Sequence, residues 1–262
     1  MSKVLNSIKE TFQNRNLLSS MIVKDFKGKY KSTHLGMLWH FVKPVILIIL
    51  FYLVFTSIRA KPLEFYWVYL CVGIFPFMFF QENLQGGSGC VVSNGGLIKK
   101  MHFPRETLVI SYVVSRLITL LITYAGLLII LIFIGYPLNP VALIFIPVVL
   151  GLSILFSLGY VFLLSSITVF VRDIQPILSS FGRVIMWTTP VVFLISEVSP
   201  VLQKIIWCNP LTYFIESYHD IIYSGVVPNT INMLVCCILT VIMLTIGLIV
   251  FNRLKGRFAE EL

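Results

Sequence analysis

Residues 141–171 read VALIFIPVVLGLSILFSLGYVFLLSSITVFV, a run without a single charged side chain. A bilayer core about 30 Å thick is crossed by a helix of roughly 20 apolar residues, so this run is long enough to span a membrane. The whole chain agrees with it: 58% of its 262 residues are hydrophobic and 12% are charged, against about 25% charged in a soluble domain. The sequence therefore predicts an all-α integral membrane protein.

Five further apolar runs of similar length lie on either side of this segment. Short stretches that are charged or rich in proline, glycine and asparagine separate the runs, and such stretches do not continue a helix. We therefore expect six transmembrane helices. They cover residues 35–58, 65–84, 107–134, 141–171, 174–196 and 231–251.

The basic residues indicate the orientation of the chain. With the N-terminus in the cytoplasm, Arg59, Lys61 and Lys204 fall outside and nearly all other lysines and arginines fall inside, as the positive-inside rule requires. We expect a multi-pass protein of the cytoplasmic (inner) membrane, with a cytoplasmic N-terminus (1–34) and a cytoplasmic tail (253–262). We therefore interpret the net charge of +9 as the result of basic residues that set the topology, and not as a basic surface that binds nucleic acid.

Residues 17–30 carry an amphipathic pattern. Apolar residues recur at helical spacing, and Lys24, Lys27 and Lys31 fall on the opposite face. This pattern predicts an N-terminal interface helix on the cytoplasmic side of the membrane, with a plain basic tail as the alternative.

Two other segments outside the spans carry helical signals. Residues 95–104 begin with two glycines and end at a proline, which predicts either a short cytoplasmic helix that docks on a partner or a connecting loop. Residues 200–227 are too short to cross the membrane twice, so we expect one or two short re-entrant helices in the outer leaflet. Asn209 followed by Pro210 gives the second of them a defined start.

The sequence lacks the motifs of the common catalytic sites. It has no Gly-x-x-x-x-Gly-Lys-Ser/Thr loop for nucleotide phosphates, no His-Glu-x-x-His motif and no Gly-x-Ser-x-Gly turn, and its five cysteines lack metal-ligand spacing. We therefore expect no catalytic residue, no metal and no cofactor bound by this chain. Any ATP hydrolysis, with its Mg²⁺, would come from a separate ATPase chain.

Ionisable residues inside membrane spans are rare and are functional candidates by default. Glu82, Arg116 and Arg183 fall at a similar depth, toward the inner leaflet. One hypothesis is an ion pair that orders the bundle; the other is that the arginines attract the phosphates of a lipid-linked substrate. Arg172 and Asp173 are further candidates for phosphate contact or gating.

Aromatic residues are abundant in the expected spans. Rings that face a pore would stack on sugars, although contact with lipid or with another helix is the commoner role of any one ring. The candidates for a channel lining are Phe75, Phe79, Phe80, Tyr160 and Trp187.

Several motifs resemble the permease subunits of ABC exporters that move lipid-linked polysaccharides, namely O-antigen, capsule and teichoic acid. They are KDFKGKYKS at 24–32, LGMLW at 35–39, GIFPF at 73–77, LIKKMHFP at 97–104, VRDI at 171–174, NPL at 209–211 and NRLKGRFAE at 252–260. They occur in order along nearly the whole chain. Gly28 and the Met101-His102 pair depart from the family pattern, which favours docking on one particular partner.

The resemblance implies a homodimer, with each copy docked on one of two ABC ATPase subunits, that moves a lipid-linked polysaccharide when ATP is hydrolysed. Among the cargoes an O-antigen-like glycan fits best, with capsular polysaccharide and teichoic acid as alternatives. The residues that would contact the ATPase are Lys24, Lys27, Tyr30, Lys31, Leu97, Ile98, Lys99, Lys100, Met101, His102 and Phe103.

Two functions from other classes compete with this interpretation. An ion-coupled secondary transporter would show inverted repeats and acidic groups near the midplane, whereas this sequence shows no such repeat and Glu82 lies off-centre. A membrane-embedded transferase would need a pair such as His219-Asp220, which the polar face of an outer helix explains more simply.

Overall fold

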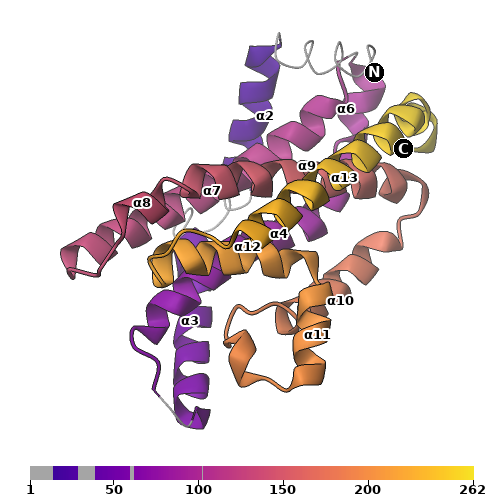
Figure 1. The fold of residues 1–262 in the computed structure, drawn as a ribbon. Coiled ribbons are helices and arrows are strands. Elements are labelled where there is room, and N and C mark those ends of the chain that lie inside the picture. Colours follow the sequence, from indigo (N-terminus) through magenta and orange to yellow (C-terminus); the bar gives the residue numbers. More distant parts are fainter. Residues whose placement is uncertain (1–13, 29–38, 60–61, 102) are drawn as a thin grey trace.

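The computed structural model describes residues 14–28, 39–59, 62–101 and 103–262, and the regular structure in these residues is helical (Figure 1). The long helices are α3 (Trp39–Ile58), α4 (Tyr66–Ser88), α7 (Glu106–Phe133), α9 (Ile146–Phe170) and α13 (Thr230–Leu254). The shorter ones are α2 (Arg15–Gly28), α5 (Cys90–Ser93), α6 (Gly95–Lys100), α8 (Pro140–Leu143), α10 (Ile174–Trp187), η2 (Ile195–Glu197), α11 (Pro200–Cys208), α12 (Pro210–Tyr218), η3 (His219–Tyr223), η4 (Lys255–Arg257) and α14 (Phe258–Glu261).

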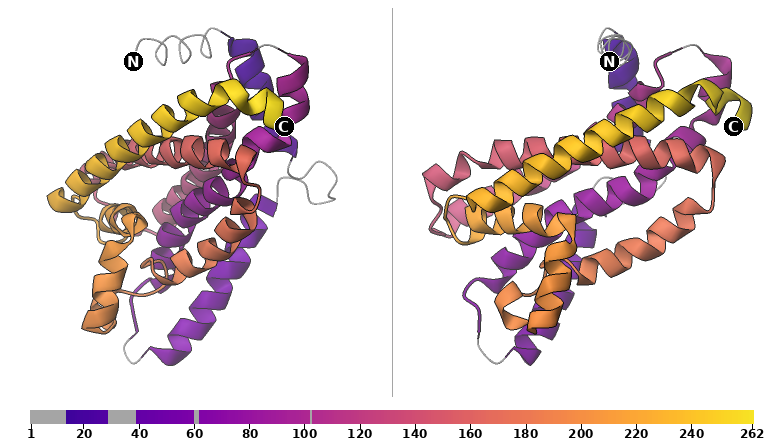
Figure 2. Two further views of the ribbon diagram at one scale, coloured as in Figure 1. Left: turned by 90° about the vertical axis from the view of Figure 1, so that its right-hand side faces the viewer. Right: turned by 45° about the vertical axis from the view of Figure 1, so that its right-hand side comes forward.

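Helices α9 and α13 form the most extensive helix pair and run side by side in the same direction (Figure 2). Two glycines bring their backbones together. A Cβ atom on Gly247 would lie 2.0 Å from the carbonyl oxygen of Gly159, and one on Gly159 would lie 2.6 Å from the backbone nitrogen of Leu244. Small residues at a crossing are the usual means of close helix packing in membranes.

Helix α4 occupies the middle of the bundle. It packs against α7 and α9 and also against α3, α10 and α12, and most of its side chains from Tyr66 to Phe80 are buried. Gly73 allows a close approach here, because a Cβ at this position would lie 2.9 Å from the carbonyl oxygen of Val191. Helix α4, whose sequence mixes apolar and polar residues, is therefore surrounded by other helices of the protein.

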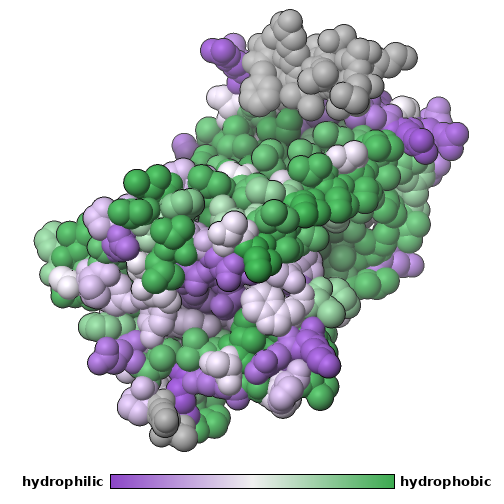
Figure 3. All heavy atoms as spheres, viewed as in Figure 1, coloured by the Kyte–Doolittle hydropathy of each residue, from purple (hydrophilic) through white to green (hydrophobic). Residues whose placement is uncertain are grey.

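Four helical segments of the described chain are long and apolar enough to cross a membrane: Phe41–Ile58, Glu106–Phe133, Pro140–Phe170 and Thr230–Glu261. They coincide with the first, third, fourth and sixth expected spans. Hydrophobic side chains cover α13 on the face seen in Figure 3. Leu234, Ile238 and Val241 of this helix are among its exposed residues. The expected all-helical membrane class is confirmed at this level.

The second and fifth expected spans differ from these four. In α4 the second half carries Gln81, Glu82 and Asn83, which lower its hydropathy. The fifth was expected as a continuous helix over 174–196, but α10 ends at Trp187. This correction has a local cause: Pro190 lacks an amide hydrogen and disfavours helical backbone before it.

The carbonyl groups beyond the end of α10 are bound by α4 instead of by a further helical turn. The Tyr66 hydroxyl donates to the Val192 carbonyl over 2.6 Å, and the Tyr69 hydroxyl donates to the carbonyls of Pro190 and Phe193 over 3.2 and 2.8 Å. Two buried tyrosines thus donate the hydrogen bonds that these carbonyls would accept from backbone amides if the helix continued.

The short helices expected outside the spans are present where the structure describes them. The expected N-terminal helix runs from Arg15 to Gly28 and packs on α7, and the expected helix near residue 95 is α6. Between α10 and α13 the structure has α11 and the joined α12 and η3, and their position in the outer leaflet stays a prediction. Asn209 caps α12, since its side chain accepts a hydrogen bond from the Leu211 amide over 3.0 Å.

Candidate functional site

Three ionisable residues, Lys43, Glu82 and Arg116, line a small cavity between α3, α4 and α7, called here the ion-pair pocket. Its volume is about 30 Å³, room for about two water molecules. It is lined by Trp39, Lys43 and Pro44 from α3, by Phe75, Met78, Phe79 and Glu82 from α4, and by Arg116, Thr119, Leu120 and Thr123 from α7.

Arg116 is the central charge of this pocket. Its Nε lies 3.5 Å from Oε2 of Glu82, and its guanidinium carbon lies 4.7 Å from the centre of the Tyr112 ring. The side chain is 7% exposed, yet Nε and Nη1 find no hydrogen-bond partner within the described part of the chain. A buried guanidinium with donors to spare can bind an anionic oxygen or water that enters the pocket.

Arg183 does not join this pair, although the sequence places it at a similar depth. It lies on an exposed face of α10, and the partner that the structure gives it is the Ser180 hydroxyl, 3.5 Å from its Nη2. Arg172 and Asp173 are exposed just before α10 begins. Of the two arginines, Arg116 and not Arg183 therefore pairs with Glu82 within the residues that the structure describes.

A second, larger cavity opens between α4, α9, α10 and the outer helices, with a volume of about 490 Å³. It is called the aromatic groove. Its walls carry Phe77, Phe80, Phe156, Tyr160 and Phe181, together with Gln81, Thr188 and Asn209 as the main polar groups. Such a mixture suits an elongated ligand with apolar faces and a few hydrogen-bonding groups.

The structure divides the five aromatic channel candidates among three places. Phe80 and Tyr160 line the aromatic groove, where the Tyr160 hydroxyl donates to the Phe80 carbonyl over 2.9 Å. Phe75 and Phe79 line the ion-pair pocket instead. Trp187 is exposed on α10 and meets the edge of Phe51 on α3, with 6.2 Å between ring centres.

The two candidate docking helices, α2 and α6, lie close together at one end of the molecule. Helix α2 lies next to the turn before α6, and Lys24 Nζ donates to the Asn94 side-chain oxygen over 2.7 Å. On α6 and after it, Lys99, Lys100 and Met101 are exposed, while Ile98 is buried. Of the other candidates, Lys27 is exposed and Leu97 and Phe103 are half-buried; Tyr30, Lys31 and His102 lie outside the described residues.

Asp25 holds the inner side of α2 against α7. The Ser111 hydroxyl on α7 donates to its carboxylate over 3.3 Å. Burial raises the pKa of the Asp25 carboxyl above its ordinary value, and the charge of Lys24, the Ser111 hydrogen bond and the charge of Arg116 offset this effect in part. The carboxylate therefore sits where its charged form is disfavoured.

The comparison with known protein families gives a match over most of the chain. A family model described as ABC-2 type transporter matches residues 16–223 of the chain.

The chain belongs to the ABC-2 type transporter family.

Its relatives in this family include three O-antigen export system permease proteins, each named RfbA. The one from Myxococcus xanthus is 26% identical and covers 99% of this chain and 100% of its own length. Two from Klebsiella pneumoniae are 28% identical and cover 98% and 94% of this chain and 100% and 95% of their own lengths. The ion-pair pocket lies wholly inside the part of the chain that the ABC-2 type model matches.

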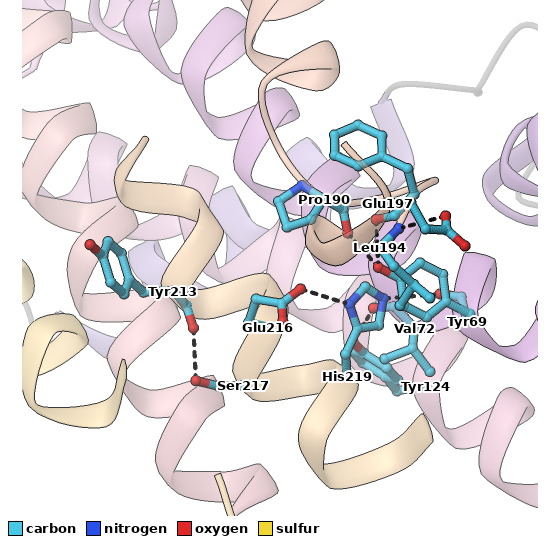
Figure 4. A network of polar contacts seen from close by, with 11 residues as sticks. Tyr69, Val72, Tyr124, Pro190, Leu194, Glu197, Tyr213, Glu216, Ser217 and His219 are labelled. Atoms are coloured by element: carbon cyan, nitrogen blue, oxygen red, sulfur yellow. Dashed lines mark hydrogen bonds and ion pairs between the residues drawn. The ribbon is translucent and has the colours of Figure 1, made fainter. Parts of the chain in front are cut away.

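In this ABC-2 type transporter, His219 at the start of η3 contacts Tyr69 of α4 and Glu216 of α12 (Figure 4). The sequence suggested the polar face of a helix, but His219 is 3% exposed, so that explanation is corrected. Its ring stacks on Tyr69 with 3.9 Å between ring centres, its Nε2 donates to the Tyr69 carbonyl over 3.1 Å, and its Nδ1 lies 3.7 Å from Glu216. Asp220 accepts a hydrogen bond from the Asn229 amide over 3.2 Å.

Sequence reasoning missed several residues that this ABC-2 type transporter brings to its cavities. Lys43 had a visible signal, because it is an ionisable residue in an apolar run, but it was interpreted only as a topology marker. No sequence pattern indicated that other polar residues would line a cavity, because polar residues of different helices face one another only once the helices are packed. These residues are Thr119, Thr123, Gln81 and Asn209.

Proposed function

We propose that this chain is the membrane-spanning permease subunit of an ATP-driven exporter that moves a lipid-linked, O-antigen-like polysaccharide across the cytoplasmic membrane. The observation that carries the proposal is the family match, together with relatives named as O-antigen export permeases that align over nearly their whole length. Export of capsular polysaccharide or teichoic acid by the same architecture is the alternative cargo.

The proposal includes a six-span topology with both termini in the cytoplasm. The four long apolar helices supply four crossings, and α4 and α10 supply the other two inside a dimer. A polar α4 and a short α10 are tolerated at membrane depth if protein or a water-filled path surrounds them. A second copy of the chain would cover the exposed apolar stripe of α10, formed by Ile177, Phe181, Val184 and Trp187.

Two copies of a separate ATPase subunit would bind the end that carries α2 and α6, and would hold the ATP and Mg²⁺. Support comes from the exposed lysines of α6 and from the hydrogen bond that joins α2 to the turn before α6. No nucleic acid is involved in this function, because the basic residues flank membrane spans.

Within the permease, the ion-pair pocket is the proposed contact for the phosphates of the lipid carrier. Arg116 supplies buried donors there, and Lys43 adds a second positive charge to the lining. Arg183 is a separate candidate on the outside of α10. Charge reversal by Arg183→Glu should lower export without unfolding the protein, and unchanged export would remove Arg183 from the site.

The first experiment is co-purification of this chain with the ATPase subunit encoded beside it. We expect a stable complex that hydrolyses ATP, and we expect Lys99→Glu with Lys100→Glu to weaken the complex or uncouple hydrolysis from export. The matched control is Arg253→Glu, a charge reversal at an exposed residue of α13 outside the docking elements. A chain that exports substrate without an ATPase would instead support an ion-coupled secondary transporter.

A further inference from the structure

The last eight residues of the sequence, 255–262, fold back on the bundle and do not extend into solvent. They form η4 and α14 at the end of α13. Phe258 is the anchor: its side chain is 0% exposed, and its ring lies 5.5 Å from the Phe251 ring and 6.4 Å from the Phe170 ring, measured between centres. The segment is thereby attached to the inner ends of α9 and α13.

A charged pair attaches the same segment to the start of α7. Lys255 Nζ lies 2.5 Å from Oε1 of Glu106, whose side chain is 2% exposed. The neighbouring Arg105 lies with its guanidinium carbon 5.9 Å from the centre of the Phe258 ring. An ion pair with one buried partner resists separation more than a surface pair does, because separation removes a positive charge from beside a buried carboxylate.

The end of the segment reaches α6. A Cβ atom placed on Gly95, at the start of α6, would lie 3.4 Å from Cβ of Leu262, and Leu262 packs against the hydrophobic core. Figures 1 and 2 show the C-terminal end beside α6 in more than one orientation. Among the described helices, α14 and α5 are the principal packing partners of α6.

Helix α6 needs such support because it is short. It has six residues and ends where Met101 takes an extended conformation. Isolated helices of fewer than about 12 residues are marginal in water, so tertiary contacts decide where this one lies. Its exposed lysines cannot supply those contacts, since they point away from the bundle.

We propose that residues 255–262 form a brace that positions α6 on the inner ends of α7, α9 and α13, so that a displacement of α6 is passed to these helices together. The brace rests on the proposed function, in which α6 receives the movement of the ATPase. Phe258 and Leu262 are positioning residues, because they act through α6 and do not touch the substrate.

The first test measures substrate exported per ATP hydrolysed, in the complex of the full chain with its ATPase subunit. Leu262→Asp and Phe258→Ala should both lose export per ATP while hydrolysis continues. The control is Glu260→Gln with Glu261→Gln, which changes α14 only at exposed positions and should leave export per ATP unchanged.

The outcomes separate the brace from the proposed function. Leu262 is half-buried, so Leu262→Asp carries less risk of misfolding than Phe258→Ala. Equal unfolding temperatures for Leu262→Asp and wild type would exclude misfolding as the cause of lost export. Export per ATP equal to wild type in Leu262→Asp would overturn the brace. A wild-type complex without ATP-dependent export would instead contradict the proposed function.

A second test locks the brace in place with a disulfide between Gly95→Cys and Leu262→Cys, after Cys208 and Cys237 are replaced by serine. The expected Cβ separation of 3.4 Å is close to the range of about 3.5–4.5 Å found in disulfides. The bond should form on oxidation and leave export intact, because the brace remains on α6 during transport. The control pair of Gly96→Cys with Leu262→Cys should cross-link less, since no atom lies within 4 Å of a Cβ at Gly96. Loss of export on oxidation, with recovery on reduction, would overturn the proposal.

Discussion

Arg116 and Glu82 are opposite charges inside the bundle, and their environments differ. The arginine is 7% exposed and the glutamate 26%. Removing one partner of a buried pair leaves the other charge without compensation, whereas removing both partners together is often nearly neutral. The pair therefore restricts which single substitutions the bundle tolerates.

We expect Arg116→Met to lower the free energy of unfolding by about 3 kcal/mol, the low end of the range for buried pairs because Glu82 keeps some solvent contact. Adding Glu82→Gln to that variant should recover part of the loss. Denaturant unfolding in detergent micelles measures both, and Arg183→Gln, at an exposed position, serves as the control. Additive effects of the two substitutions would show that the charges do not interact.

Asp25 predicts a pH dependence at the contact between α2 and α7. Because burial raises the pKa of its carboxyl above 3.8, the folded state favours the protonated form. The associated stability is fully present below the unfolded pKa and is lost as the pH rises through the folded one. Asp25→Asn should therefore raise the unfolding temperature at pH 7 more than at pH 4.

Ser111 provides the matched variant for this prediction. Its hydroxyl donates to the Asp25 carboxylate and lowers the pKa of that group. Ser111→Ala should consequently raise the pKa further and steepen the loss of stability between pH 4 and pH 7. If the unfolding temperature changed with pH equally in wild type, Asp25→Asn and Ser111→Ala, the pH dependence would not come from the Asp25 carboxyl.

At the scale of elements, the crossing of α9 and α13 depends on Gly159 and Gly247. No side chain fits at Gly247, where even a Cβ would overlap the Gly159 backbone. Gly247→Ala should force the helices apart and lower the free energy of unfolding by about 1–3 kcal/mol, as overpacking does. Thermal unfolding in detergent measures the change.

The control for this substitution lies in α9 itself. Gly151→Ala places its methyl group in open space and should leave stability unchanged or raise it by up to about 1 kcal/mol. If both variants lost the same stability, the loss could not be assigned to the crossing of α9 and α13.

Helix α10 shows why element boundaries are harder to predict than elements. Its apolar residues continue past its end into Val191, Val192 and Phe193, so the hydropathy pattern favoured a helix to residue 196. The helix ends earlier because Pro190 cannot continue it and because Tyr66 and Tyr69, from a distant segment, bind the released carbonyls. The first cause is local, and the second exists only after α4 and α10 have packed.

At the scale of the whole molecule, the proposed six spans place the loops on defined sides. Single cysteines at Lys204 and Val227 should react with a membrane-impermeant thiol reagent added to intact cells, after the native cysteines have been replaced. Cysteines at Lys99 and Glu260 should react only after the membrane is permeabilised. All four residues are exposed in the structure. Labelling of Lys99→Cys from outside would contradict the topology.

Part of the candidate site could be predicted from the sequence. The similar depth of Glu82 and Arg116 follows from counting residues along two expected spans of opposite direction, and the structure brings the two side chains together. The same count placed Arg183 beside them, but it lies on an exposed face of α10. Depth is set by position along a helix, whereas contact also depends on rotation about the helix axis.

The sequence by itself determined the membrane class and the helical secondary structure, and the orientation that it favours stays a prediction. These properties depend on run length, flanking charge and capping residues, all of which are local along the chain. Only the tertiary structure decided that Arg116 and not Arg183 meets Glu82, that Phe80 faces the groove while Phe79 faces the ion-pair pocket, and that His219 is buried. Those outcomes depend on which helix faces pack together, and packing joins residues far apart in sequence through contacts that no single segment contains.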